Sequence, residues 1–339
     1  MHMADALLSP AVGAGMWLAS AAALAWSHAR LRRDADERIV PLMGVLGAFV
    51  FAAQMINFAI PGTGSSGHLG GGLLLALLLG PHAGLVVIAS VLTVQALFFA
   101  DGGLLALGAN IVNLGVVPCF VAYPLYRVLT AGRSSPRRQA LAVGVAAIVA
   151  LQLGALGVVL QTTASGIASL PTTAFLALML PIHAAIGVVE GLATAAVLAF
   201  VRRAQPQWLE RADAGRPASG PRRVLVGVLG AAALLTGTTV SWLASAAPDG
   251  LEWSVERVAG APELEAPETR WHRVAGEVQQ HTAWMPGYAL PAPAADGDPQ
   301  EAQHWPAVDA GTSLAGLLGG VLTLALVGGL ARWLARRRR

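Results

Sequence analysis

The chain has 339 residues, of which 55% are hydrophobic and only 12% are charged, whereas an ordinary soluble domain carries about 25% charged residues. All 22 of its basic residues are arginine, and a P-loop needs a lysine, so hydrolysis of ATP by that route is excluded. The single cysteine, Cys119, leaves no intrachain disulfide. The composition therefore indicates a membrane protein without an ATPase site of that kind.

Nine apolar segments follow one another along the chain, and a helix that crosses a membrane needs about 20 such residues. The segments cover residues 8–29, 40–60, 69–79, 83–99, 107–129, 140–162, 172–201, 224–247 and 313–334. The third is too short to cross a membrane alone at ~1.5 Å per residue, so we expect it to lie among other helices. The pattern predicts an all-α integral membrane protein: a seven-helix bundle with one short helix, followed by two more transmembrane helices.

The positions of the arginines predict how the chain is oriented. If the N-terminus lies outside, 19 of the 22 arginines fall on the inner side, and the three outside are Arg257, Arg270 and Arg273. This asymmetry agrees with the positive-inside rule. We expect a multi-pass protein of the cytoplasmic (inner) membrane, with its N-terminus outside and its C-terminus in the cytoplasm. The basic charge then reflects topology, and no nucleic-acid partner is expected.

The first two residues, Met1 and His2, can form a metal chelate. The Met1 amine, the His2 amide nitrogen and the His2 imidazole Nδ1 can close adjacent five- and six-membered rings around one ion. An amide nitrogen binds only after losing its proton, which Ni(II) and Cu(II) promote in a square plane. A fourth nitrogen is required, and His68, in the glycine-rich loop 62–68 on the same side of the membrane, is the candidate. The alternative is that Met1 is merely the start residue and the loop a flexible connection.

Several polar residues lie within the predicted bundle, where an ionisable group at mid-helix costs about 2.5–3.5 kcal/mol. A metal-bound histidine usually donates its other ring nitrogen to an acceptor, so polar neighbours of the chelate are candidate supports. These candidates are Ser66, Gln95, Asn110 and Asn113. Interhelical hydrogen bonding is the alternative for the amides.

Four separated motifs resemble one family, in the family's order. They are Met1-His2 with Leu8-Ser9, the loop Ser65-Ser66-Gly67-His68, the run from Gln95 to Asn110, and the run from Pro171 to Leu192. Over roughly residues 1–203 they resemble the cobalt/nickel substrate-binding subunit of energy-coupling-factor (ECF) transporters.

The resemblance to the ECF subunit implies a metal site and a set of partners. It implies that the Met1 amine, the His2 amide and imidazole, and His68 hold Ni²⁺, with Co²⁺ as the alternative. It also implies a coupling membrane subunit and a pair of cytoplasmic ATPases. Ala4 and Ala6 depart from the family, which often has Pro or Met, and Gly, at these positions.

The C-terminal part carries a second resemblance. The sequence Pro-Asp-Gly-Leu-Glu-Trp at 248–253, with Pro286-Gly287-Tyr288 and a last helix, resembles the PDGLE domain, an auxiliary subunit of the same transporters. Gly287 stands where the family usually has Asp. We therefore predict a substrate-binding domain at 1–203, a cytoplasmic linker at 204–221 and a PDGLE-type domain at 222–339.

The outside loop of this C-terminal part, residues 248–311, holds eleven carboxylates against three arginines. We interpret it as a solvated loop, because its acids and histidines show no tight ligand spacing; attraction of cations is the alternative. All proposed metal ligands precede residue 69, so the site itself is expected not to need this part.

The function that these features favour is capture of a metal ion for ATP-driven import, by a transport subunit that is not an enzyme. The alternative is a rhomboid-like intramembrane serine protease. Its Gly-x-Ser-Gly pattern at 64–67 would make Ser66 the nucleophile and His183 its base. That alternative leaves Met1, His2, His68 and the C-terminal half unexplained.

Overall fold

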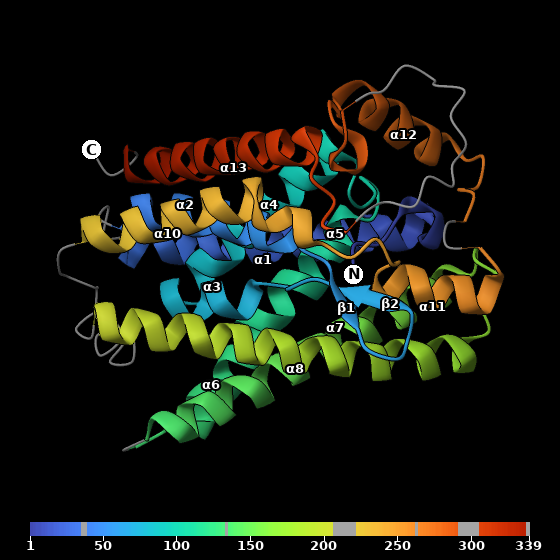
Figure 1. Cartoon of the computed structure of the whole chain (residues 1–339). Coiled ribbons are helices and arrows are strands. Elements are labelled where there is room, and N and C mark those ends of the chain that lie inside the picture. The colour runs from blue at the N-terminus through green and yellow to red at the C-terminus, as the bar shows by residue number, and fades with distance from the viewer. Residues whose placement is uncertain (35–38, 133–134, 206–221, 262–263, 291–304, 337–339) are drawn as a thin grey trace.

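The computed structural model describes residues 1–34, 39–132, 135–205, 222–261, 264–290 and 305–336, and nearly all of their regular structure is helical (Figure 1). Within this part of the chain, five helical segments are long and apolar enough to cross a membrane. These are Pro81–Phe99, Leu107–Leu129, Pro136–Ser165, Thr172–Ala204 and Ala310–Leu330. The prediction of an all-α membrane protein is confirmed.

The N-terminal part begins with a 3-10 turn and continues into a helical bundle. The turn is Asp5–Leu7, and the helices are α1 (Pro10–Asp34), α2 (Val40–Gln54), α3 (Gly72–Leu79), α4 (Pro81–Phe99), α5 (Leu107–Ile111), α6 (Tyr123–Leu129), α7 (Pro136–Ser165) and α8 (Thr172–Ala204). Two π-helical turns, Val112–Val116 and Pro118–Ala122, join α5 to α6 in one continuous segment. The short helix α3 is buried from Gly72 to Leu78, as predicted for a helix that lies among others.

The C-terminal part contributes four helices to the same body. They are α10 (Arg222–Thr238), α11 (Gly250–Ala259), α12 (Arg270–Thr282) and α13 (Ala310–Arg336), with 3-10 turns at Val240–Leu243 and Pro286–Tyr288. The acidic segment between α10 and α13 therefore contains two helices that were not predicted. Asp249 and Glu252 form a capping box that starts α11, and Thr269 caps the start of α12. The predicted linker, 204–221, lies almost entirely outside the described residues.

The predicted second span, 40–60, is wrong at its end. Helix α2 stops at Gln54, and Phe58–Ile60 forms strand β1, antiparallel to β2 (Ser65–Gly67). The turn between the strands uses Gly62 and Gly64 at φ +77° and +76°, a conformation that glycine adopts readily. A short apolar run fits a helix end or a buried strand equally well, so hydropathy alone does not separate the two.

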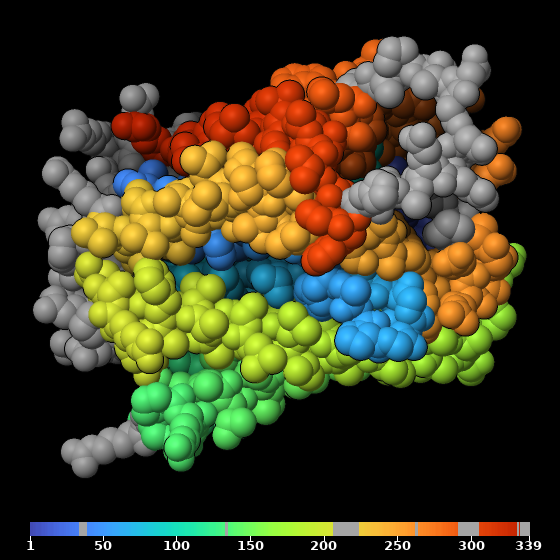
Figure 2. All heavy atoms as spheres, viewed as in Figure 1, coloured from blue at the N-terminus to red at the C-terminus, as the bar shows by residue number. Residues whose placement is uncertain are grey.

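The C-terminal helices are built into the bundle. Helices α10 and α13 pack on α2, and α11 packs on α8. The space-filling view shows the β1–β2 hairpin framed by α8, α10 and α11 (Figure 2). Glycines allow the close approach of α10 and α13, because a Cβ at Gly316 would lie 2.0 Å from the carbonyl oxygen of Gly237.

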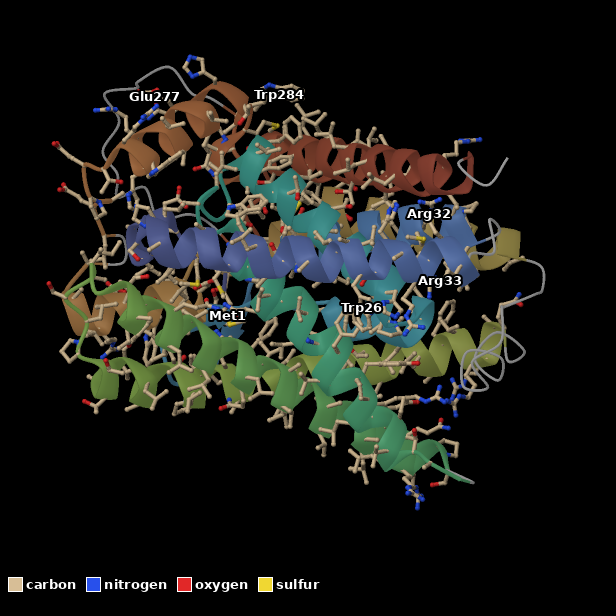
Figure 3. All side chains as sticks on the ribbon, turned by 180° about the vertical axis from the view of Figure 1, so that it is seen from behind. Met1, Trp26, Arg32, Arg33, Glu277 and Trp284 are labelled. Carbon is tan, nitrogen blue, oxygen red and sulfur yellow. The ribbon has the colours of Figure 1, made fainter. Side chains whose placement is uncertain are left out.

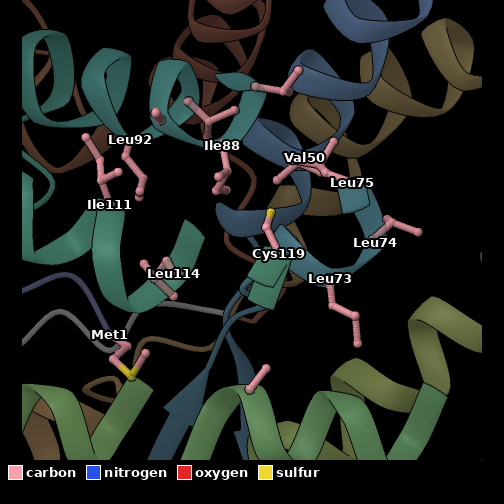
Figure 4. Close-up of a cluster of buried hydrophobic side chains, with 14 of the residues drawn as sticks. Met1, Val50, Leu73, Leu74, Leu75, Ile88, Leu92, Ile111, Leu114 and Cys119 are labelled. Atoms are coloured by element: carbon pink, nitrogen blue, oxygen red, sulfur yellow. The ribbon is translucent and has the colours of Figure 1, made fainter. Parts of the chain in front are cut away.

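The side chain of Met1 belongs to the hydrophobic core. Only 5% of Met1 is exposed, and it joins the same buried cluster as Leu114, Ile111 and Leu73 (Figure 4). A Cβ at Gly154 of α7 would lie 2.8 Å from the Met1 Cε, so the N-terminus fits closely against that helix. The core therefore fixes the position of the chain's first residue.

The contact between α10 and α13 gives a test of the fold. We expect Gly316→Val to separate these helices and to lower the free energy of unfolding by about 1–3 kcal/mol, the usual effect of overpacking. The control is Gly328→Val in the same helix, where a Cβ meets nothing within 4 Å. Thermal unfolding of both purified variants checks this, and equal melting temperatures would contradict the described packing.

Candidate metal centre

The amine of Met1 is buried between two side chains from distant parts of the chain. Its nitrogen lies 2.8 Å from His68 Nε2 and 2.6 Å from Asp249 Oδ2. His68 Nε2 and Asp249 Oδ2 are 3.7 Å apart, so the three groups form a compact cluster. The predicted meeting of the N-terminus with the His68 loop is thus present, and a carboxylate from the C-terminal part joins it.

His68 is held in the tautomer that a metal ligand needs. Its Nδ1–H donates to the carbonyl oxygen of Leu69 at 3.1 Å, which leaves the lone pair of Nε2 facing the amine. Burial and the neighbouring N-terminal ammonium lower the pKa of His68, which favours the neutral form that binds metals. The chain after His68 is fixed from α8, because Glu190 accepts hydrogen bonds from the amides of Gly70 and Gly71 at 2.8 and 3.1 Å.

The ring of His2 stacks on that of His68, with the centroids 4.9 Å apart and the planes 8° from parallel. Its Nδ1 lies 2.9 Å from Asp101 Oδ1, and its buried Nε2 has no hydrogen-bond partner among the described residues. Asp101 also accepts a short hydrogen bond from the hydroxyl of Tyr288, which belongs to the C-terminal part. Burial would raise the pKa of Asp101, but the His2 ring and the Tyr288 hydroxyl outweigh it and hold that pKa below its usual range.

The backbone after His2 is held by hydrogen bonds to the segment 103–110. Asn110 accepts from the Met3 amide at 2.8 Å and donates to the Met3 carbonyl oxygen at 3.2 Å. The amide of Ala106 donates to the Asp5 carboxylate at 2.9 Å. A Cβ at Gly103 would lie 1.9 Å from Asp5 Oδ1, so only glycine fits beside Asp5 there.

Asp249 reaches the amine because its segment is tied to the hairpin. The hydroxyl of Ser66 donates to the carbonyl oxygen of Ala247 at 2.7 Å, and the Ser66 amide donates to that of Pro248 at 2.8 Å. Burial would raise the pKa of Asp249, but the ammonium of Met1 and the imidazole of His68 hold it well below its usual range. The Asp249 carboxylate therefore acts as the counter-charge of the buried amine.

The predicted supporting residues divide into two groups. Ser66 and Asn110 contact segments that carry the candidate ligands. The side-chain amide of Asn113 donates to Gln161 Oε1 of α7 at 2.8 Å, and its one contact near the candidate ligands is a weak one, to the Met3 sulfur at 3.8 Å. Gln95 is fully buried, and its backbone carbonyl oxygen accepts a hydrogen bond from the Asp101 amide. Within the described residues, its side chain makes no hydrogen bond to a candidate ligand.

Asp101, Asp249 and Tyr288 were not predicted as site residues. Each lies within a motif that the sequence displays, at 101–104, 248–253 and 286–288. What the sequence did not indicate is that these loops gather around the first two residues: Tyr288 bonds to Asp101, Asp101 contacts His2, and Asp249 contacts the Met1 amine.

The protease alternative has no geometric support. The Ser66 hydroxyl donates to a backbone carbonyl oxygen, and His183 Nδ1 bonds to the carbonyl oxygen of Met179, while its Nε2 has no partner among the described residues. A serine nucleophile needs a hydrogen-bonded base, and these two side chains do not form that pair.

The chemistry of the centre depends on the N-terminus. Among the described residues no group of three or more His, Cys, Asp or Glu side chains is arranged to hold a metal ion. The amine, the first amide nitrogen and two imidazoles can together supply the four nitrogens that Ni(II) prefers. The arrangement therefore suits a metal held by backbone and side-chain nitrogen together.

Two family models cover most of the chain. Residues 2–208 match the cobalt uptake substrate-specific transmembrane region, and residues 222–336 match the PDGLE domain. A protein of Archaeoglobus fulgidus, provisionally named fused nickel transport protein NikMN, is 34% identical over 98% of this chain and 99% of its own length.

Two further relatives agree with this assignment. The fused nickel transport protein NikMN of Rhodobacter capsulatus is 31% identical over 97% of this chain and 96% of its own length. The cobalt transport protein CbiM of Geobacter sulfurreducens is 32% identical over 76% of this chain and 78% of its own length. The chain therefore belongs to the cobalt uptake substrate-specific transmembrane family, in a form that carries a fused PDGLE domain.

Proposed function

We propose that this protein captures Ni²⁺, and less readily Co²⁺, as the substrate-binding component of an ATP-driven ECF transporter. Metal uptake by a transport component that is not an enzyme follows from the family. The observation that supports the finer proposal is the buried Met1 amine, 2.8 Å from His68 Nε2. Nickel is favoured because an amide-containing square plane suits Ni(II) and because two relatives carry nickel in their names.

Capture of the ion needs one rearrangement at His2. The chelate uses Nδ1, which contacts Asp101, and a square plane places the two imidazoles around the ion, whereas here they stack. A turn of the His2 side chain brings Nδ1 toward the amine and His68. After this turn, the Nε2–H of His2 can donate a hydrogen bond to the Asp101 carboxylate. A carboxylate that accepts from a metal-bound histidine fixes the ring and strengthens the ligand.

The C-terminal part supports this site through charge and position. Asp249 neutralises the amine before the ion arrives, and it lies close enough to balance positive charge when the ion is bound. Tyr288 holds Asp101, and His272 holds the segment around Asp5. We therefore propose that the PDGLE part keeps the N-terminal chelate in place, which revises our expectation that the site does not need it.

The partners and orientation complete the proposal. The chain has no P-loop lysine, so energy for uptake comes from other chains. The resemblance to ECF transporters implies that these are a coupling membrane subunit and a pair of cytoplasmic ATPases. The protein lies in the cytoplasmic (inner) membrane with its N-terminus outside, as the arginine distribution favours.

The free amine gives the most direct test of the proposal. Adding one residue before Met1, or acetylating it, should abolish tight nickel binding, because the chelate loses its first nitrogen. Nickel retained by purified protein is measured by elemental analysis after desalting, with the intact N-terminus established by mass spectrometry. A thermal unfolding scan controls for folding. Nickel binding by the extended protein that equals that of the native protein would refute the chelate.

The histidines give a second test. We expect His2→Ala and His68→Ala each to reduce nickel uptake by cells by more than the roughly 10–100-fold loss that a supporting residue causes. The control is His82→Ala, since His82 lies at the other end of the bundle, where Nδ1 bonds to the Ser27 hydroxyl at 3.1 Å. Equal losses in all three variants would indicate folding damage and would contradict the site.

The role of the Asp249 carboxylate is tested by a substitution that removes its charge but keeps its role as the N-cap of α11. Asp249→Asn keeps a good N-cap residue for α11 but removes the charge beside the amine. We expect it to weaken nickel binding about 10- to 100-fold.

The matched control is Glu252→Gln. Glu252 forms the other half of the capping box, accepting from the Asp249 amide at 2.9 Å, and among the described residues no hydrogen bond joins it to the Met1 amine. Titration of both variants with nickel in detergent checks the prediction. Normal affinity of Asp249→Asn would show that the charge is dispensable.

A further inference from the structure

Helix α12 holds the N-terminal part from one of its faces. His272, which is 5% exposed, donates through Nε2–H to the carbonyl oxygens of Asp5 and Leu8 at 3.1 and 3.0 Å. Gln279, seven residues later, donates to the carbonyl oxygens of Ala96 and Gly102, both at 2.8 Å. Residues seven apart lie on the same side of a helix, so this inward face holds both the segment that follows Met1 and His2 and the loop that carries Asp101.

A second face of α12 is apolar and uncovered. Trp271, Val274 and Val278 are 59%, 41% and 45% exposed, and their i, i+3, i+7 spacing places them in one stripe. The stripe faces a groove of about 730 Å³ whose other wall is α1, with Trp17 and Leu18. Figure 3 shows α12 beside the end of α1 that lies opposite Arg32 and Arg33.

The groove continues the exposed apolar side of α1. Leu18 of α1 is 73% exposed, and residues 8–29 are predicted from the sequence to cross the membrane, although α1 is not among the five helical segments named above. Exposing a wide apolar stripe to water costs free energy. In a membrane protein, the acyl chains that surround the bundle can remove such a stripe from water. The groove and the exposed side of α1 thus form one continuous apolar surface.

The edges of α12 carry the groups that favour a bilayer surface. Arg270 and Arg273 lie in its first turn, and Arg270 is stacked over the Trp271 ring at 5.9 Å. Trp284, 53% exposed, follows the helix. Tryptophans gather at the membrane–water boundary, and arginines there attract lipid phosphate. An apolar stripe flanked by arginine and tryptophan is typical of a helix that lies in the membrane–water interface.

We propose that α12 is an interfacial helix whose Trp271–Val274–Val278 stripe sits in the leaflet of a phospholipid bilayer on the side of the N-terminus. The acyl chains fill the groove between α12 and α1, and Arg270, at the edge of the stripe, contacts lipid phosphates. Since the inward face of the same helix grips Asp5, Leu8 and the loop at Gly102, the bilayer sets the position of the helix that holds the N-terminal segment.

Site-directed spin labelling tests this placement, and the chain suits it because its single cysteine, Cys119, is buried. A nitroxide is attached at Val278→Cys on the stripe and, as the control, at Gln280→Cys on a solvent-facing side of the same helix. The full-length protein is placed in phosphatidylcholine–phosphatidylglycerol nanodiscs. Collision of each label with oxygen, which concentrates in lipid, and with chromium oxalate, which stays in water, is then measured.

We expect the Val278 label to collide with oxygen and to be protected from chromium oxalate, and the Gln280 label to show the reverse. A Val278 label as accessible to chromium oxalate as that at Gln280 would place α12 in water and overturn the proposal. Protection of Val278 from both reagents would mean that protein covers the groove, which also overturns it.

A second measurement keeps the proposal testable if the label disturbs folding. In nanodiscs that contain brominated lipid, Trp271→Phe should reduce the quenchable part of the tryptophan fluorescence. The control Trp253→Phe should leave it unchanged, because the Trp253 indole is bonded to the Thr63 carbonyl oxygen in the α11 region. Equal quenching in Trp271→Phe and the unmodified protein would contradict the contact with lipid.

Discussion

The burial of the Met1 amine between His68 and Asp249 is the contact on which the rest of the site depends. A buried ammonium is costly unless it is paired and hydrogen-bonded. The pairing carboxylate stands 248 positions further along the chain, so the C-terminal part supplies the counter-charge of the N-terminus. The fusion of the two parts therefore has a physical reason at the site itself.

The rest of the N-terminal segment is held through its backbone. Asn110 bonds both polar groups of Met3, and His272 bonds two carbonyl oxygens further on. These contacts hold the main chain without using the His2 side chain, so the turn of that side chain proposed above does not require the main chain to move. A chelate that uses a backbone amide needs this combination, because the backbone nitrogens must be placed before the ion arrives.

Much of the fold follows from composition, because long apolar runs need a bilayer around them and arginines gather on the cytoplasmic side of a membrane. Strand β1, Phe58–Ile60, was not predicted, because a short apolar run does not reveal whether it ends a helix or forms a strand. The proposed chelate of Met1 and His2 could be predicted because its donors are adjacent in sequence. Asp101 and Asp249 were not, because their roles arise only when loops far apart in the chain meet.

The central claim is that a methionine nitrogen binds the metal. Copper(II) can stand in for nickel at such a site. Protein labelled with ¹⁵N only in its seven methionines is loaded with Cu²⁺, and its electron paramagnetic resonance spectrum is compared with that of unlabelled protein. We predict that the nitrogen hyperfine pattern changes as expected for one ¹⁵N ligand. Identical spectra would show that no methionine nitrogen, and so not the Met1 amine, is bound to the metal.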